Sequence, residues 1–235
     1  MTNKTIHILK GVIFLIISLY LAFTFTTSLT NFVGKVPIVG WVSGSVILRL
    51  VISLAFARGV QLIYKAVTSS DKSILVFLIG TLVGFTIVFI AQPIYTTDYG
   101  NFGTTDLSID IEELKNETYP ELELNSNHAL IVFFSTNCGS CKEMSTKIGQ
   151  LQSIGRLPNV IALFPGNESD AIQFMTENNG NGFNHYMINN DEYFQQTADF
   201  SFPSIFLVDK TGKTIQHWDG SLMNYTAFDI IESYN

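Results

Sequence analysis

The chain has 235 residues, a formal net charge of −7 and 47 % hydrophobic residues, and these are distributed unevenly. Residues 1–97 carry seven basic side chains and one acid, whereas residues 98–235 carry six basic side chains and nineteen acids. A basic apolar half followed by an acidic polar half indicates a membrane module joined to a soluble domain. The acidity of the second half argues against nucleic acid as a partner, because phosphate binding needs clustered Lys and Arg.

Three apolar stretches in residues 1–97 predict a transmembrane helical module. Residues 11–30 contain no charge and are long enough for a hydrocarbon core of ~30 Å. This run is longer than the ~7–15 residues typical of a cleaved signal peptide. Residues 74–95 form an equally apolar span. Residues 38–63 are apolar except for two arginines, and we expect a second span there.

The basic residues around these spans predict the orientation. One side has four lysines and a nearby arginine: Lys4, Lys10, Lys65, Lys72 and Arg58. The other side has a single lysine, Lys35. The positive-inside rule places the N-terminus in the cytoplasm and residues 98–235 outside. With two spans instead of three, the soluble domain would lie inside. We therefore predict a multi-pass cell-membrane protein with an extracytoplasmic domain.

The two arginines within the second span are candidates for a function, because charge inside a membrane is costly. The favoured interpretation is structural: Arg58 extends toward the cytoplasmic headgroups, and Arg49 packs against a polar neighbour. No acid within the spans could serve as a relay partner. Two glycine pairs with G-x-x-x-G spacing favour close helix packing within one bundle: Gly40/Gly44 and Gly80/Gly84.

Residues 98–125 are rich in Asp, Glu, Asn and Thr and predict an acidic linker, with one short helix around IDIEELKN. From residue 126 the pattern changes to alternating strands and helices. The apolar run ALIVFF predicts a strand buried on both faces. Further strands are expected at 159–164, 183–188, 204–209 and 214–219, and helices at 142–155, 168–180 and 222–234, with a short helix or an irregular connection at 190–200. This order predicts an α/β domain over residues 126–235, with a mixed central sheet flanked by helices.

Both cysteines of the chain lie in the stretch FFSTNCGSCK, where the first buried strand gives way to a helix. Free N–H groups and the helix dipole at this position stabilise a thiolate, so the pKa of Cys138 should be lowered. Gly139 leaves the sulfur accessible. Cys141, one helical turn later, is more shielded and placed to attack a mixed disulfide formed at Cys138. The pair therefore predicts thiol–disulfide exchange.

Two alternatives for the cysteine pair carry less weight. A closed zinc site needs four ligands, and the three histidines of the second half, His128, His185 and His217, show no metal-binding spacing. We therefore predict no metal. A static disulfide between Cys138 and Cys141 would close a loop too small to add much stability.

Residues 126–235 resemble the thioredoxin superfamily and are most similar to its membrane-anchored TlpA-like branch. The resemblance is carried by the strand followed by CGSCK and by the segment FPSIFLVDKTGKTIQHWDG. It implies a thioredoxin-like fold and a cis peptide bond before Pro203, facing the cysteines. It also implies that backbone groups of Phe202 pair with a bound substrate chain. The alternative for Pro203 is an ordinary proline at the start of a strand.

The sequence differs from many thioredoxins at two positions. Asn137 stands where many have a tryptophan, and Val132 stands where many bury an acid used for proton transfer. Both differences count against an efficient general-purpose reductase, while leaving thiol–disulfide exchange possible.

We therefore predict a membrane-anchored, extracytoplasmic thiol–disulfide oxidoreductase of bacterial origin. Cys138 is the expected nucleophile, Cys141 the resolving thiol, and Phe202 with Pro203 the substrate platform, with no dissociable cofactor. The expected partners are cysteine-containing exported proteins or peptides, a membrane electron donor or acceptor, and membrane lipid. One alternative is an accessory protein that forms disulfides in a secreted peptide such as a bacteriocin. Another is a non-catalytic binding module or membrane-complex subunit that retains the thioredoxin fold.

Overall fold

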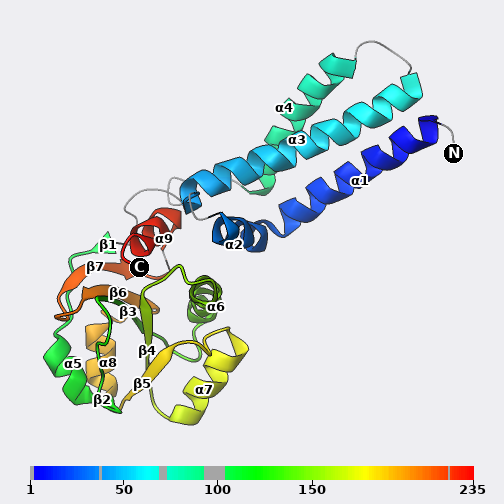
Figure 1. The fold of residues 1–235 in the computed structure, drawn as a ribbon. Coiled ribbons are helices and arrows are strands. Elements are labelled where there is room, and N and C mark those ends of the chain that lie inside the picture. Colours follow the sequence, from blue (N-terminus) through cyan, green and yellow to red (C-terminus); the bar gives the residue numbers. More distant parts are fainter. Residues whose placement is uncertain (1–2, 37–38, 69–72, 93–103, 222) are drawn as a thin grey trace. The chain divides into compact units, whose positions relative to one another are not determined.

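The computed structural model describes residues 3–36, 39–68, 73–92, 104–221 and 223–235. The chain divides into two compact units, Met1–Thr96 and Thr97–Asn235. The first is made of helices and the second is built around a sheet (Figure 1).

The first unit contains α1 (Asn3–Phe23), α2 (Phe25–Lys35), α3 (Trp41–Thr68) and α4 (Ser73–Ala91). The helices α1, α3 and α4 are long and apolar enough to cross a membrane, which confirms the predicted module of three such helices. The first span was predicted at residues 11–30, but α1 covers Asn3–Phe23, so the predicted bounds are wrong. Thr24, between α1 and α2, has φ −100° and ψ 28°, outside the α-helical region, so the helix is interrupted there and α2 begins at Phe25. Residues 93–95 of the predicted third span lie outside the described residues.

Glycines allow the helices of this unit to approach closely. A Cβ atom at Gly59 would lie 2.9 Å from the Gly11 carbonyl oxygen, and one at Gly84 would lie 3.0 Å from the Ser53 carbonyl oxygen. A Cβ atom at Gly44 would clash with a side chain of α2. Gly44 and Gly84 therefore pack within one bundle, as their spacing favoured.

The helices α1 and α3 run antiparallel. Gly11 lies opposite Gly59, and the Ser18 hydroxyl donates a 3.1 Å hydrogen bond to the Ile52 carbonyl. The N-terminal end of α1 therefore lies beside the C-terminal end of α3. That end carries the basic residues Lys4, Lys10, Arg58 and Lys65. Lys72 lies outside the described residues.

Arg49 is buried in the bundle, with 2 % of its surface exposed. Its Nε donates to the Gln92 carbonyl and its Nη1 to the Ser45 carbonyl, each at 3.2 Å. The guanidinium also lies over the Phe25 ring, 4.7 Å from its centroid, a favourable cation–π geometry. These contacts give Arg49 the structural role favoured from the sequence. Arg58, by contrast, is exposed.

The second unit is built on a seven-stranded sheet with the order β1-β7-β6-β3-β4-β5-β2 (Figure 1). The strands are β1 (Thr104–Thr105), β2 (Thr118–Tyr119), β3 (His128–Phe133), β4 (Asn159–Pro165), β5 (Asn184–Ile188), β6 (Ser204–Asp209) and β7 (Thr214–Asp219). The neighbours β3, β4 and β5 are parallel, and all other pairs are antiparallel. This is the mixed sheet predicted from the sequence.

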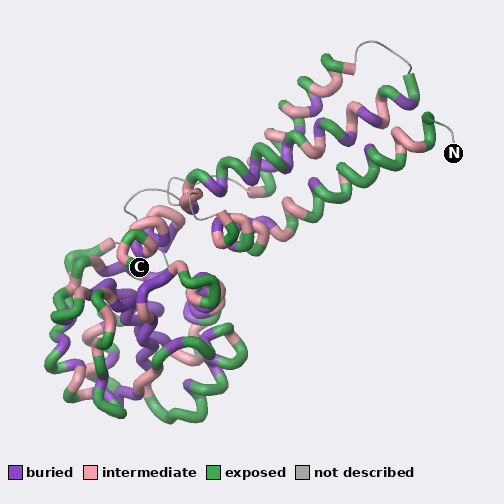
Figure 2. The backbone as a smooth tube through the Cα atoms, in the orientation of Figure 1, coloured by how far each residue is buried: buried purple, intermediate pink, exposed green. Residues whose placement is uncertain are grey.

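Helices cover both faces of the sheet, and their bounds are α5 (Ile111–Glu117), α6 (Gly139–Ser153), α7 (Glu168–Glu177), α8 (Asp191–Thr197) and α9 (Tyr225–Glu232). One face packs against α5 and α8 through a cluster that includes Leu114, Phe133 and Phe194. On the opposite face, Phe134 packs against Phe174 of α7. The central strands are buried along their length (Figure 2).

The linker predicted at 98–125 is wrong from residue 104 onward; residues 98–103 lie outside the described residues. Both β1 and β2 pair with the sheet, and α5 packs on it. The predicted short helix is present, and the Asp110 carboxylate accepts hydrogen bonds from the N–H groups of Glu112 and Glu113. The domain includes this segment because Ile111, Leu114 and other apolar side chains between the acids enter the core.

Candidate active site

Cys138 ends the loop after β3 and caps helix α6. Its sulfur accepts a hydrogen bond from the backbone N–H of Cys141, with 3.1 Å between Sγ and N. The first N–H groups of a helix lack intrahelical acceptors, and the dipole there favours negative charge. The sulfur therefore lies where a thiolate is stabilised, as the strand-to-helix junction indicated.

Ser140 and Phe202 complete the polar surroundings of this sulfur. Cys138 Sγ lies 3.1 Å from Ser140 Oγ and 3.5 Å from the Phe202 carbonyl oxygen. The Ser140 hydroxyl also donates to the Phe202 carbonyl at 3.2 Å. A hydroxyl has one proton, so Ser140 donates either to this carbonyl or to the sulfur. Ionisation of Cys138 favours the bond to the sulfur, because a thiolate accepts and no longer donates.

The two cysteines differ in how readily they lose a proton. Burial raises the pKa of Cys138, but hydrogen bonds from Cys141 and Ser140 outweigh this effect and hold the pKa below its usual value. Burial raises the pKa of Cys141 far above its usual value, and its hydrogen bond to Cys138 acts in the same direction. Cys141 is fully buried, whereas Cys138 is partly exposed. Cys138 is therefore the accessible nucleophile of the pair.

Phe202 and Pro203 lie beside the cysteines on a loop that is held at both ends. The peptide bond between them is cis. The Gly220 N–H donates a 2.7 Å hydrogen bond to the Pro203 carbonyl, and the Ser201 hydroxyl donates a 2.9 Å hydrogen bond to the Asp219 carboxylate. The structure thus brings together the four site residues that the sequence indicated. The role of Phe202 and Pro203 in substrate binding stays a prediction.

A buried hydrogen-bonded chain behind Pro203 was not predicted from the sequence. His217 on β7 lies 2.7 Å from Ser204 Oγ through Nε2 and 2.7 Å from Thr105 Oγ1 through Nδ1. Burial lowers the pKa of His217 to about 4, although the charges of Asp219 and Asp199 oppose this. The neutral ring therefore links β1 to the residue after Pro203. The sequence around His217 could not predict these contacts, because Ser204 and Thr105 lie 13 and 112 residues away along the chain.

The two departures from the thioredoxin pattern have different surroundings. Val132 is fully buried, so an apolar side chain occupies the position where many relatives bury an acid. Asn137 is exposed and lines a polar hollow of about 290 Å³ beside the cysteine loop, together with Lys142, Asp170 and Glu177.

The other histidines lie apart from the cysteines. His128 Nδ1 is 3.0 Å from the Tyr234 carbonyl, and His185 is 3.8 Å from the Glu168 carboxylate. Among the described residues, no group of three or more His, Cys, Asp or Glu side chains is arranged to hold a metal ion.

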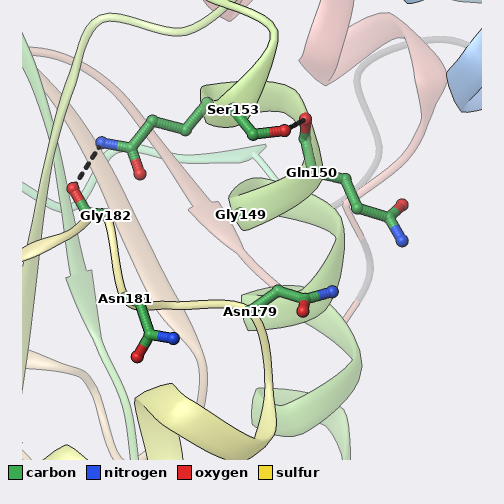
Figure 3. Close-up of a pocket in the computed structure, with 7 residues that line it drawn as sticks. Gly149, Gln150, Ser153, Asn179, Asn181 and Gly182 are labelled. Atoms are coloured by element: carbon green, nitrogen blue, oxygen red, sulfur yellow. Dashed lines mark hydrogen bonds between the residues drawn. The ribbon is translucent and has the colours of Figure 1, made fainter.

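A second hollow, of about 540 Å³, lies at the far end of α6 from the cysteines (Figure 3). Amide side chains dominate it. Gln152 Nε2 donates a 2.9 Å hydrogen bond to the Gly182 carbonyl, and Asn179 and Asn181 come from the turn between α7 and β5 (Figure 3). None of its lining residues belongs to the redox site.

The family model for a thioredoxin-like domain matches residues 116–233. No curated protein matches the sequence. Among solved structures, the thioredoxin domain of a thiol-disulfide oxidoreductase from Bacteroides vulgatus is 16 % identical, with a TM-score of 0.37, covering 48 % of this chain and 82 % of that one.

A secreted disulfide oxidoreductase from Mycobacterium tuberculosis is 12 % identical, with a TM-score of 0.37, covering 48 % of this chain and 83 % of that one. A thiol:disulfide interchange protein from Bacteroides sp. is 16 % identical, with a TM-score of 0.36, covering 47 % and 76 %. Likenesses this distant add nothing to the family match, which spans half of the chain and includes Cys138, Cys141 and Pro203. The chain belongs to the family of thioredoxin-like domains.

Proposed function

We propose that this protein is a membrane-anchored, extracytoplasmic thiol–disulfide oxidoreductase that exchanges disulfides with exported proteins through its CGSC motif. The observation that carries the proposal is the asymmetry of the two cysteines. Cys138 is partly exposed and its sulfur accepts the N–H of Cys141, whereas Cys141 is fully buried. The Cys138 sulfur is accessible to a substrate, and Cys141 follows it by one helical turn.

The exchange proceeds in two balanced steps. The Cys138 thiolate attacks one sulfur of a substrate disulfide, which forms a mixed disulfide and releases the other sulfur as a thiolate. Cys141 then gives its proton to the substrate thiolate released in the first step and attacks the Cys138 sulfur, which forms the internal disulfide and releases the second substrate sulfur as a thiolate. Two electrons pass from the protein to the substrate, and the same steps in reverse oxidise a substrate dithiol.

The Cys141→Ser variant tests this mechanism. Without the resolving thiol, a substrate captured by Cys138 cannot be released by internal attack. Mixed disulfides with extracytoplasmic proteins should accumulate in cells and appear on non-reducing gels. The matched control Cys138→Ser should trap little, because the remaining thiol is buried. If Cys141→Ser yields no adducts while the protein is folded, the exchange role fails and a non-catalytic binding module takes its place.

The extracytoplasmic location is supported by the charges at the helix ends. Lys4, Lys10, Arg58 and Lys65 gather at the end of the bundle where α1 begins and α3 ends. The positive-inside rule assigns such an end to the cytoplasm. Three crossings then place the second unit, which follows α4, on the opposite side.

Labelling of single cysteines tests this topology. In a Cys138→Ser/Cys141→Ser background, Ser108→Cys should react with a membrane-impermeant maleimide in intact cells, because Ser108 is exposed on the second unit. Lys65→Cys, exposed near the end of α3, is the control and should react only after the membrane is broken. The reverse pattern would place the redox site in the cytoplasm and overturn the proposed location.

A further inference from the structure

An exposed aromatic side chain stands on the loop that carries Phe202. Phe200 has 68 % of its surface exposed. Of the phenylalanines described in the second unit, it alone is mostly exposed; eight others are buried, and Phe202 is half-buried. A single exposed apolar residue is common on a protein surface, so the position of Phe200 relative to the redox site decides whether it has a role.

The backbone holds Phe200 in this place. Asp199 and Phe200 have φ angles of 50° and 54°, in the left-handed region that bulky residues avoid. Three backbone hydrogen bonds fix the turn: Asp199 N–H to Gln196, Phe200 N–H to Gln195 and Ser201 N–H to Ala198. These bonds form the C-terminal cap of α8, which accounts for the positive φ angles, and the exposed ring is therefore presented by an ordered turn.

Phe200 is also close to the nucleophile. The Phe202 carbonyl oxygen lies 3.5 Å from Cys138 Sγ. Two residues of chain span at most about 7 Å, so the Cα atom of Phe200 lies within about 13 Å of that sulfur. A substrate cysteine joined to Cys138 has its own second neighbours about 7 Å away along an extended chain. A side chain on such a neighbour is long enough to meet the Phe200 ring.

We propose that Phe200 selects substrates: the redox site favours polypeptides with a large apolar side chain two residues from the reacting cysteine. Burial of an aromatic ring against such a side chain supplies binding free energy that a polar residue cannot supply. Phe202 stacks on Phe194, with centroids 5.2 Å apart, and so is held against the core. Phe200 remains available to the substrate. This inference rests on the proposed exchange function and adds a substrate class to it.

The test uses the reduced full-length protein in detergent micelles and two synthetic peptides. Each peptide carries its single cysteine as a disulfide with 2-mercaptoethanol, and they differ only two residues from that cysteine, leucine in one and serine in the other. We expect exchange with the leucine peptide to be about tenfold more efficient, through a lower KM. Phe200→Ser should bring this ratio to within about twofold of one, and Phe200→Leu should retain most of it.

Ile172→Ser is the matched control, because Ile172 is also an exposed apolar residue but lies on α7. It should keep the wild-type ratio. Equal rates of the wild-type protein with both peptides would overturn the inference and leave Phe200 to another partner, such as a lipid surface. A full ratio in Phe200→Ser would also overturn it. If the wild-type protein exchanges with neither peptide nor with bis(2-hydroxyethyl) disulfide, the proposed function itself fails.

Discussion

The two units of this chain differ in how many of their large apolar side chains are exposed. In the first unit, α1 and α4 expose large aliphatic residues such as Ile16 and Leu82, and α1 buries only Gly11 and Ser18. In the second unit, large aromatic and aliphatic residues fill the interior of the sheet and its covering helices. Large aliphatic residues exposed along whole helices fit the apolar surroundings proposed for the first unit, whereas the second unit hides its large apolar residues as a domain in water does.

The two units also differ in the polar side chains that they bury. The first unit buries the guanidinium of Arg49, which donates to the Gln92 carbonyl just after α4 and to the Ser45 carbonyl of α3. Gln92, whose carbonyl accepts from Arg49, donates in turn to the Ala22 carbonyl near the end of α1. The second unit buries His217 without charge, between two hydroxyl groups. Four variants test this difference between the two units.

The largest effect is expected from removing a ring in the second unit. Phe134 is fully buried and its ring lies 5.4 Å from that of Phe174, measured between centroids. Phe134→Ala should lower the free energy of unfolding by about 3–5 kcal/mol, because it leaves a cavity. Urea denaturation followed by Trp218 fluorescence, in a Trp41→Phe background, measures this. The exposed Ile172→Ala should change it by about 0.5 kcal/mol or less; equal losses would show that the sheet core is loosely packed.

A somewhat smaller effect is expected from pH. His217 has a pKa of about 4 in the folded protein and about 6.5 in the unfolded chain. Between these pH values the unfolded chain binds a proton at His217 and the folded protein does not. The free energy of unfolding should therefore fall by about 2–3 kcal/mol as the pH drops from 6.5 to 4. The charges of Asp199 and Asp219 oppose this fall. His217→Gln should flatten the slope in the same denaturation assay, and an unchanged slope would contradict the assignment.

In the first unit, replacing a glycine at a helix contact with a larger residue should lower stability. A Cβ at Gly59 would lie 2.9 Å from the Gly11 carbonyl oxygen and 2.8 Å from Leu15 Cγ. Gly59→Val should therefore destabilise the bundle by about 1–3 kcal/mol through overpacking. Titration with sodium dodecyl sulfate in mixed micelles measures the loss. The control Leu54→Val alters a half-exposed position on α3. If both variants behave alike, close helix contact does not hold the bundle together.

The smallest effect is expected at the surface of the second unit, where a single hydrogen bond is at stake. Ser140→Ala removes a donor to Cys138 Sγ and should raise the pKa of Cys138. Alkylation of Cys138 by iodoacetamide at neutral pH should slow by about threefold to tenfold. Ser153→Ala, on the same helix but away from the site, should leave the rate unchanged. A faster reaction in Ser140→Ala would contradict the donor role of Ser140.

The parts of the fold that the sequence could predict are those with a regular pattern. The run ALIVFF and the spacing of Met144, Ile148 and Leu151 gave β3 and α6, and the strand-to-helix junction located Cys138. The strands β1 and β2 could not be found in this way, because two residues have no period. The break at Thr24 was missed because hydropathy carries no information on backbone dihedral angles, and Thr24 leaves the helical region.

Only those features of the site that lie close together in the sequence, or that a family resemblance marks, could be predicted. The cysteines lie within one turn of helix, and the segment FPSIFLVD marked Pro203 through a family resemblance. The links from Ser140 to Phe202 and from His217 to Thr105 join residues 62 and 112 positions apart. Such contacts depend on the strand order, which one sequence does not reveal. Phe200 was missed because an exposed phenylalanine looks like any core residue until its burial is known.

The short strands β1 and β2 have one more consequence. They occupy the two edges of the sheet, and each is only two residues long. Sheet edges are where separate molecules join into aggregates, and short edge strands are a known protection. Because β1 pairs with β7 and β2 with β5, each edge of the sheet offers another molecule only two residues of strand, which disfavours edge-to-edge association of the domain.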